Sequence, residues 1–182
     1  MPSPITSKSI AFWPSFGVIA VGDFITKRMA ESLLTLHVPH SVAGDFIRMT
    51  LTYNTGAALN LSFGEWSRIV LSALAATMLV ILYRMYRSAE PRDAWQALAL
   101  GLIAGGALGN LMDRIRSPRG VVDFIDIGTE AWRFWTFNVA DSAVFTGAIL
   151  LALVLMRRPT EPEVTVAPVI ESAPSAPPPA DR

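Results

Sequence analysis

The chain has 182 residues, of which 52% are hydrophobic and only 16% charged, and its mean hydropathy is +0.41. This is too apolar for an ordinary soluble domain, and the apolar residues fall in blocks, which indicates a polytopic membrane protein. Fifteen basic and 15 acidic residues leave no net charge, so nothing points to a nucleic-acid partner. The chain has no cysteine, which excludes thiol nucleophiles, and only two histidines with no HExxH motif, which argues against a zinc hydrolase.

Four apolar segments are candidates for membrane-spanning helices. Basic residues at their ends can extend the shorter ones by snorkelling to the interface. A cleaved signal peptide is the alternative for the first segment, but no A-x-A-like site follows it and its basic pair lies at the wrong end. Trp132 lies just before the last segment and Trp135 begins it, at the membrane interface that aromatic rings favour. The segments are residues 10–25, 69–83, 94–112 and 135–156.

The third segment carries Gly101, Gly105 and Gly109, which repeat every four residues and therefore line one face of a helix. Small residues at this spacing let a neighbouring helix approach closely. We interpret these glycines as a packing seam.

Between the first two segments the sequence has the period of a strand. Over residues 47–54, apolar residues alternate with Arg48, Thr50, Thr52 and Asn54. The NTG at 54–56 breaks the run, and AALNLSF at 57–63 resumes it, which predicts a small sheet on the membrane surface. His37 and His40 are expected in a loop exposed to water. Residues 159–182 are rich in proline and alanine and are expected to form a disordered tail.

Two aspartates lie among apolar neighbours, Asp123 in GVVDF and Asp141 in FNVADSA. A carboxylate beside hydrocarbon is costly and usually functional, and two together suggest a pair that shares a proton and activates water. Asp141 lies six residues into its span, roughly 9 Å below the helix start. One carboxyl should be protonated and the other ionised near neutral pH, but the sequence leaves open which is which.

Each acidic residue also has a structural interpretation. Asp141 could cap its helix or pair with a loop arginine, and Asp123 could be a polar turn residue. Asp113 abuts Arg114 at the end of the third span, so an ion pair or a cap is the expected role. Asp126 is expected to be a solvated loop carboxylate.

Two other functional classes remain as alternatives. One is a small proton-coupled transporter with Asp23, Asp113 and Asp141 as relay carboxylates, although four short spans leave little room for alternating access and no inverted repeat is visible. The other is a membrane scaffold that uses the glycine face for association.

Several blocks resemble the signature of bacterial lipoprotein signal peptidase. They are GDFITK at 22–27, NTGAA at 54–58, GNLMDR at 109–114, GVVDF at 120–124 and FNVADSA at 137–143, in the family's order and spacing. Three positions differ from the usual pattern: Phe24 replaces glutamine, and Leu59 and Asn60 replace phenylalanine and serine.

The resemblance implies an intramembrane aspartyl endopeptidase without metal or cofactor, which cleaves prolipoproteins before a diacylglyceryl cysteine. Asp123 and Asp141 match the catalytic pair, and Asp23 and Lys27 match a supporting pair. The positions matching those that shape the site and contact the substrate are Asn54, Gly56, Asn110, Arg114 and Asn138.

The implied architecture is four transmembrane helices with a small extracytoplasmic sheet, inserted between helices 1 and 2, that cradles the substrate. Residues 1–158 would form the membrane peptidase domain. It is expected to be a monomer that contacts membrane lipids in the bacterial inner membrane. Both termini would be cytoplasmic, which the basic residues between the second and third spans also favour, and the active site would lie near the extracytoplasmic face.

Overall fold

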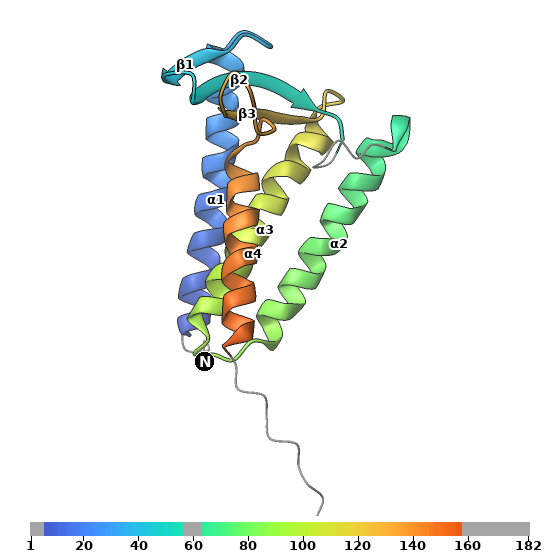
Figure 1. Ribbon diagram of the computed structural model, residues 1–182. Helices are drawn as coiled ribbons and strands as arrows, with labels where there is room; N and C mark the ends of the chain where they lie inside the picture. The colour runs from blue at the N-terminus through green and yellow to red at the C-terminus, as the bar shows by residue number, and fades with distance from the viewer. Residues whose placement is uncertain (1–5, 57–62, 158–182) are drawn as a thin grey trace, which may run out of the picture.

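The computed structural model describes residues 6–56 and 63–157. In this part of the chain four helices form a bundle, a three-stranded sheet crosses one end of it, and α1 begins and α4 ends at the opposite end (Figure 1). All four helices are long and apolar enough to cross a membrane, which confirms the predicted spans. The elements are α1 (Ser7–Leu33), β1 (His40–Ala43), β2 (Ile47–Asn54), η2 (Gly64–Trp66), α2 (Ser67–Ser88), α3 (Ala94–Arg116), β3 (Val121–Ile127) and α4 (Val139–Met156).

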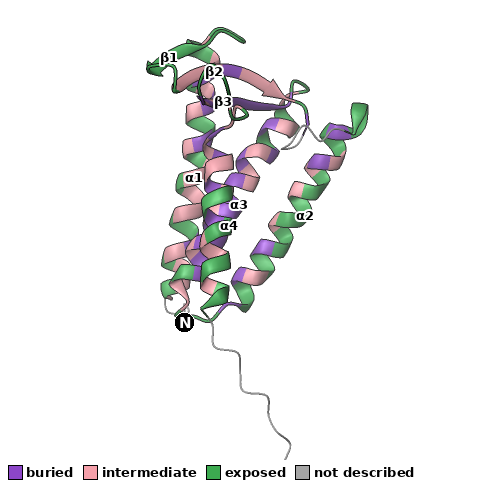
Figure 2. Cartoon of the chain, viewed as in Figure 1, coloured by how far each residue is buried: buried purple, intermediate pink, exposed green. Residues whose placement is uncertain are grey.

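Helix α3 forms the centre of the bundle, and it is the most buried of the four helices (Figure 2). Its glycine face packs against α1 at very short range. A Cβ atom at Gly101 would lie 2.7 Å from the carbonyl oxygen of Phe12, and one at Gly105 would lie 2.8 Å from that of Phe16. The predicted packing seam is therefore confirmed, with α1 as the partner helix.

The sheet has the antiparallel order β1-β2-β3. The prediction of a strand over residues 47–54 is confirmed, since β2 spans the same residues. Two strands come from the connection between α1 and α2, but only β2 was predicted, because β1 forms where a loop was expected. The third strand, β3, comes from the connection between α3 and α4. The resumed run after the NTG turn lies largely outside the described residues, as does the proline-rich tail.

Strand β3 corrects two predictions. Asp123, whose structural alternative was a polar turn residue, lies in the edge strand β3 and pairs with Thr52 of β2. Asp126, expected to be solvated, is only 7% exposed, and its carboxylate accepts a hydrogen bond from Thr50 and pairs with Arg133. The histidine prediction holds in part: both side chains are exposed, but only His37 lies in the loop, because His40 begins β1.

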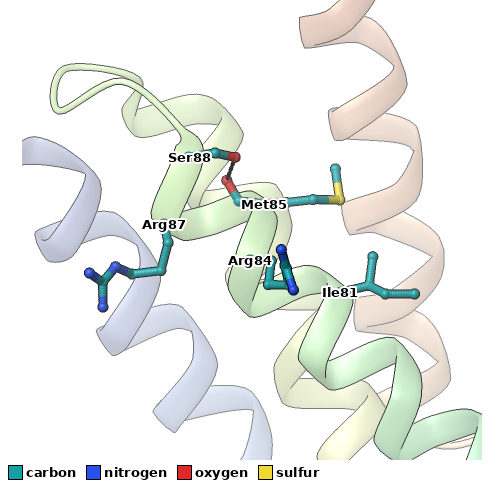
Figure 3. Close-up of a pocket in the computed structure, with 5 residues that line it drawn as sticks. All are labelled: Ile81, Arg84, Met85, Arg87 and Ser88. Carbon is teal, nitrogen blue, oxygen red and sulfur yellow. Dashed lines mark hydrogen bonds between the residues drawn. The ribbon is translucent and has the colours of Figure 1, made fainter.

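A hollow of about 570 Å³ lies along the last turns of α2, at the opposite end of the bundle (Figure 3). Its lining includes Arg84 and Arg87 but no carboxylate. The two candidate catalytic residues lie at the sheet end, Asp123 in β3 and Asp141 in the first turn of α4.

The glycine seam leads to a stability prediction. Gly105→Ala should lower the free energy of unfolding by about 1–3 kcal/mol, because the new methyl group would overlap the α1 backbone. Gly22→Ala is the matched control, since a Cβ atom there meets nothing within 4 Å and alanine favours helix. Thermal unfolding in detergent micelles would compare them, and an equal effect of both changes would contradict the seam.

Candidate active site

The site is built around the N-terminus of α4. Asn138 caps this helix: its side-chain oxygen accepts a hydrogen bond from the backbone N–H of Asp141 at 2.9 Å. In return, the Asp141 carboxylate accepts one from the backbone N–H of Asn138 at 3.2 Å. The helix begins at Val139 and not at residue 135, because Phe137 forms an antiparallel bridge with Ile125 of β3. Asp141 therefore lies in the first turn of α4, beside the sheet, and the prediction that it lies about 9 Å down the helix is wrong.

Asp123 faces this helix end from β3, and it is only 2% exposed. Its carboxylate accepts hydrogen bonds from the side-chain amides of Asn138, at 2.7 Å, and Asn54, at 3.2 Å. Burial raises the pKa of the Asp123 carboxyl to about 7, and the negative charge of Asp141 contributes to the rise, whereas the two amides oppose it. Near neutral pH, Asp123 is therefore partly protonated.

Asn110 of α3 completes the link between the two carboxyls. Its side-chain NH2 group donates to Asp141 at 2.7 Å, and its side-chain oxygen accepts from Asn138 at 3.1 Å. A continuous hydrogen-bonded path thus runs from Asp123 through Asn138 and Asn110 to Asp141. Two amides hold the carboxyls in fixed orientations.

Behind this path lies a buried ion-pair cluster centred on Lys27. Its ammonium is 2.7 Å from the Asp23 carboxylate and 3.0 Å from that of Asp113, and it donates to the Asn110 oxygen at 2.9 Å. The Asp23 carboxylate also accepts from the amide of Ala140, at 2.9 Å, in the first turn of α4. The two residues predicted as a supporting pair are therefore in contact and joined to the site.

The predicted ion-pair role of Asp113 is confirmed, but its partners are Lys27 and Arg28 and not the adjacent Arg114. Adjacent helical residues point in different directions, so Asp113 faces Lys27 and Arg28 of α1. Arg114 instead turns to the other side, where it donates to the carbonyl of Asn110 at 3.2 Å and to that of Gly56 at 3.1 Å. The arginine thereby connects α3 to the chain just after β2.

Both carboxyls open onto one cavity of about 1380 Å³. Six of the nine predicted site residues line it, namely Asp123, Asp141, Asn54, Gly56, Asn110 and Arg114, whereas Asn138, Asp23 and Lys27 are buried behind the wall. The sequence reading missed the apolar wall of this cavity, although it had noted two tryptophans nearby as interfacial. The wall comprises Trp132, Phe134, Trp135 and Phe137 from the connection to α4, and Val144, Phe145 and Ala148 from α4 itself.

A sequence model of the family described as Signal peptidase (SPase) II matches residues 15–157. The chain belongs to this family. The lipoprotein signal peptidase of Coxiella burnetii (strain Dugway 5J108-111) is 35% identical over 161 residues, covering 86% of this chain and 98% of that protein. That of Pseudomonas syringae pv. tomato (strain ATCC BAA-871 / DC3000) is 40% identical over 144 residues, covering 78% and 82% respectively.

The fold of this signal peptidase II family member also resembles a solved structure. A bacterial membrane enzyme determined by the in meso method at 1.9 Å resolution has a TM-score of 0.70 and 26% sequence identity. The match covers 79% of this chain and 90% of that one. The four-helix architecture with its small sheet is thus shared with an experimentally determined membrane enzyme.

The Lys27 cluster predicts a large loss of stability when the cation is removed. Lys27→Met should lower the free energy of unfolding by about 3–5 kcal/mol, because Asp23 would stay buried without a cation and Asp113 would keep only Arg28. Arg116→Met removes a cation that pairs with Glu31 but is 45% exposed, so its effect should stay below about 1 kcal/mol. Denaturant unfolding in micelles would measure both. Similar losses would mean that the cluster is not a structural centre.

Proposed function

We propose that this chain is an aspartic endopeptidase that removes signal peptides from prolipoproteins, with Asp123 and Asp141 as its catalytic pair. The observation that carries the proposal is that both carboxyls line one cavity and are joined by a continuous path of side-chain amides. The family assignment supports the substrate class, because the relatives compared above are lipoprotein signal peptidases.

In the proposed reaction the two carboxyls have different roles. Asp141 sits at a helix N-terminus, where the helix dipole favours negative charge, so it takes the proton from the attacking water. Asp123, with its raised pKa, is the protonated partner and donates a hydrogen bond to the scissile carbonyl. The water oxygen bonds to the carbonyl carbon. Asp141 then returns its proton to the leaving nitrogen as the C–N bond breaks.

We propose that Asn54, Gly56, Asn110 and Arg114 shape the polar end of the cavity around the scissile bond. Arg114 holds the backbone of Gly56 beside the carboxyls and places a positive charge in the cavity wall. Asn138, Asp23 and Lys27 support the pair from behind and, being buried, do not contact the substrate directly.

We further propose that cleavage occurs before a diacylglyceryl cysteine and near the extracytoplasmic face of the bacterial inner membrane. The cavity passes from the carboxyls to apolar side chains on α4, which suits acyl chains beside a polar scissile bond. Arg84 and Arg87 in the last turns of α2, Arg92 in the connection to α3 and Lys8 at the start of α1 favour cytoplasmic termini. A monomer is sufficient, since one chain supplies both carboxyls.

The decisive test is the loss of either carboxyl. Asp123→Asn and Asp141→Asn should each reduce cleavage of a diacylglyceryl precursor peptide by at least about 1000-fold, because water activation and carbonyl polarisation need both groups. Mass spectrometry of the products would locate the cut. The unlipidated peptide, tested beside it, should be cut far more slowly if the acyl chains bind in the cavity.

Asp93→Asn is the matched control for these two changes. Asp93 caps α3 at the other end of the bundle, and asparagine caps a helix equally well, so activity should persist. Cleavage by the Asp123→Asn protein would overturn the proposal. If the protein were instead a proton-coupled transporter with Asp23, Asp113 and Asp141 as relay carboxylates, the Asp123→Asn variant would still function.

The raised pKa of Asp123 predicts a pH dependence. The value of kcat/KM should fall by about tenfold per unit as pH rises above about 7, because Asp123 then loses the proton it donates to the carbonyl. Asn54→Ala removes a hydrogen bond that favours the ionised form, so it should move this fall to higher pH. A shift to lower pH, or no fall up to about pH 9, would contradict the assignment of the proton to Asp123.

A further inference from the structure

The chain between β3 and α4, residues 128–137, folds back along the sheet and forms one wall of the cavity. We call it the aromatic segment. Its amides at Phe134 and Phe137 donate to the carbonyls of Ile127 and Ile125, at 2.8 and 3.0 Å. The rings of Phe134 and Trp135 lie 5.1 Å apart, and those of Phe134 and Phe137 lie 5.9 Å apart, so the aromatic side chains form a connected cluster on the cavity side.

These rings are large and incompletely covered. Trp132 is 66% exposed, Trp135 57% and Phe134 45%, although all three line the cavity. Clustered aromatic side chains that remain open in a cavity are typical of surfaces that bind an apolar partner. The rings pack mainly on one another, so their position depends on how the backbone of the segment is held.

One side chain of the segment turns away from the cavity and fastens it to the sheet. The Arg133 guanidinium donates to the Asp126 carboxylate at 2.8 Å and to the backbone carbonyl of Asp45 at 2.6 Å. The second oxygen of Asp126 accepts from the Thr50 hydroxyl at 3.0 Å. The Asp126 side chain is only 10% exposed and that of Arg133 25%, so this pair is better shielded than an ordinary surface ion pair.

A separate feature holds the same segment close to β3. A Cβ atom at Gly128 would lie 2.6 Å from the Cα atom of Arg133 and 2.9 Å from its Cγ atom. Only glycine allows this approach, because any larger residue would push the backbone of Arg133 outward. The Asp126–Arg133 ion pair and Gly128 thus each hold the backbone at Arg133 against the sheet, and neither contact depends on the other.

We propose that Asp126 and Arg133 are positioning residues for substrate binding: they hold the aromatic segment as a preformed wall against which the apolar part of the signal peptide packs. This rests on the proposed function above. Neither residue lines the cavity, and the contacts described for them involve neither Asp123 nor Asp141, so they act on affinity and not on the chemical step. A wall that must be ordered during binding weakens affinity, whereas a preorganised wall does not.

The test separates KM from kcat on the diacylglyceryl precursor peptide. Arg133→Ala and Asp126→Asn should each raise KM by about three- to tenfold and leave kcat within about twofold. Arg133→Lys, which keeps the charge but not the two-pronged contact, should recover part of the loss. Glu130→Gln is the control, since it removes a charge from an exposed side chain of the same segment and should leave both constants unchanged.

Hydrogen exchange without substrate supplies a second readout. In Arg133→Ala the amides of Thr129 and Phe134 should exchange faster, while those of β2 paired with β3 stay protected. Gly128→Ala should give the same pattern and serves if Arg133→Ala does not fold. Faster exchange with an unchanged KM, or a loss confined to kcat, would overturn the proposal. Failure of the wild-type protein to cut would instead overturn the proposed function, and exchange would still show whether the pair fastens the segment.

Discussion

The arrangement of the site depends on one buried cation. Lys27 is 1% exposed, and an ammonium so far from water is tolerated only where acceptors surround it, here Asp23, Asp113 and Asn110. Because an ammonium can only donate, Asn110 must turn its oxygen towards Lys27 and its NH2 group towards Asp141. The side-chain oxygen of Asn110 also accepts a hydrogen bond from the side-chain NH2 group of Asn138. The side-chain oxygen of Asn138 is then oriented to accept from the first turn of α4 and cap this helix. The lysine therefore fixes the orientation of both amides that join the carboxyls.

The two carboxyls that these amides join have different surroundings. Asp141 accepts from a backbone amide at a helix N-terminus and from Asn110, so its environment is rich in donors for negative charge. Asp123 lies on a buried strand without a helix end, and its pKa rises to about 7. This difference matches the proposed roles: Asp141 is the general base, and Asp123 donates a hydrogen bond to the scissile carbonyl. The asymmetry comes from secondary structure, since one aspartate begins a helix and the other lies within a sheet.

The sequence predicted the parts of the site that lie in apolar or periodic segments. The spans, β2 and the glycine seam follow from composition and period, and six of the nine expected site residues meet at one cavity. The sequence did not predict β3, because VVDFIDI lacks the alternation of apolar and polar residues that marks a half-exposed strand. Four successive residues from Val121 are buried, and so is Asp126, so both faces of this strand are covered. Its β-branched and aromatic residues between Gly120 and Gly128 were the available signal for a strand.

The remaining differences concern ion-pair partners that only the folded structure brings together. Asp113 forms an ion pair, as expected, but its partners come from α1, more than 80 residues earlier, and not from the adjacent Arg114. Asp126 was assigned to water, although Arg133 folds back to reach it. Neither partnership can be deduced from spacing, since both exist only once helix packing and the return of the aromatic segment bring the charges together.

The two walls of the cavity are held in different ways, and this difference bears on function. At the polar wall, every carboxyl oxygen of Asp123 and Asp141 accepts a hydrogen bond, and the supporting lysine is buried, so small movements there would leave charges uncompensated. The aromatic wall is fastened by a partly exposed ion pair and by backbone contacts, and its rings are open to the cavity. An enzyme that breaks a peptide bond needs fixed geometry at that bond, and the polar wall supplies it. The two walls meet at Phe137, whose bridge to Ile125 sets the start of α4 just before the cap Asn138, so the backbone that carries the rings also fixes where Asp141 lies.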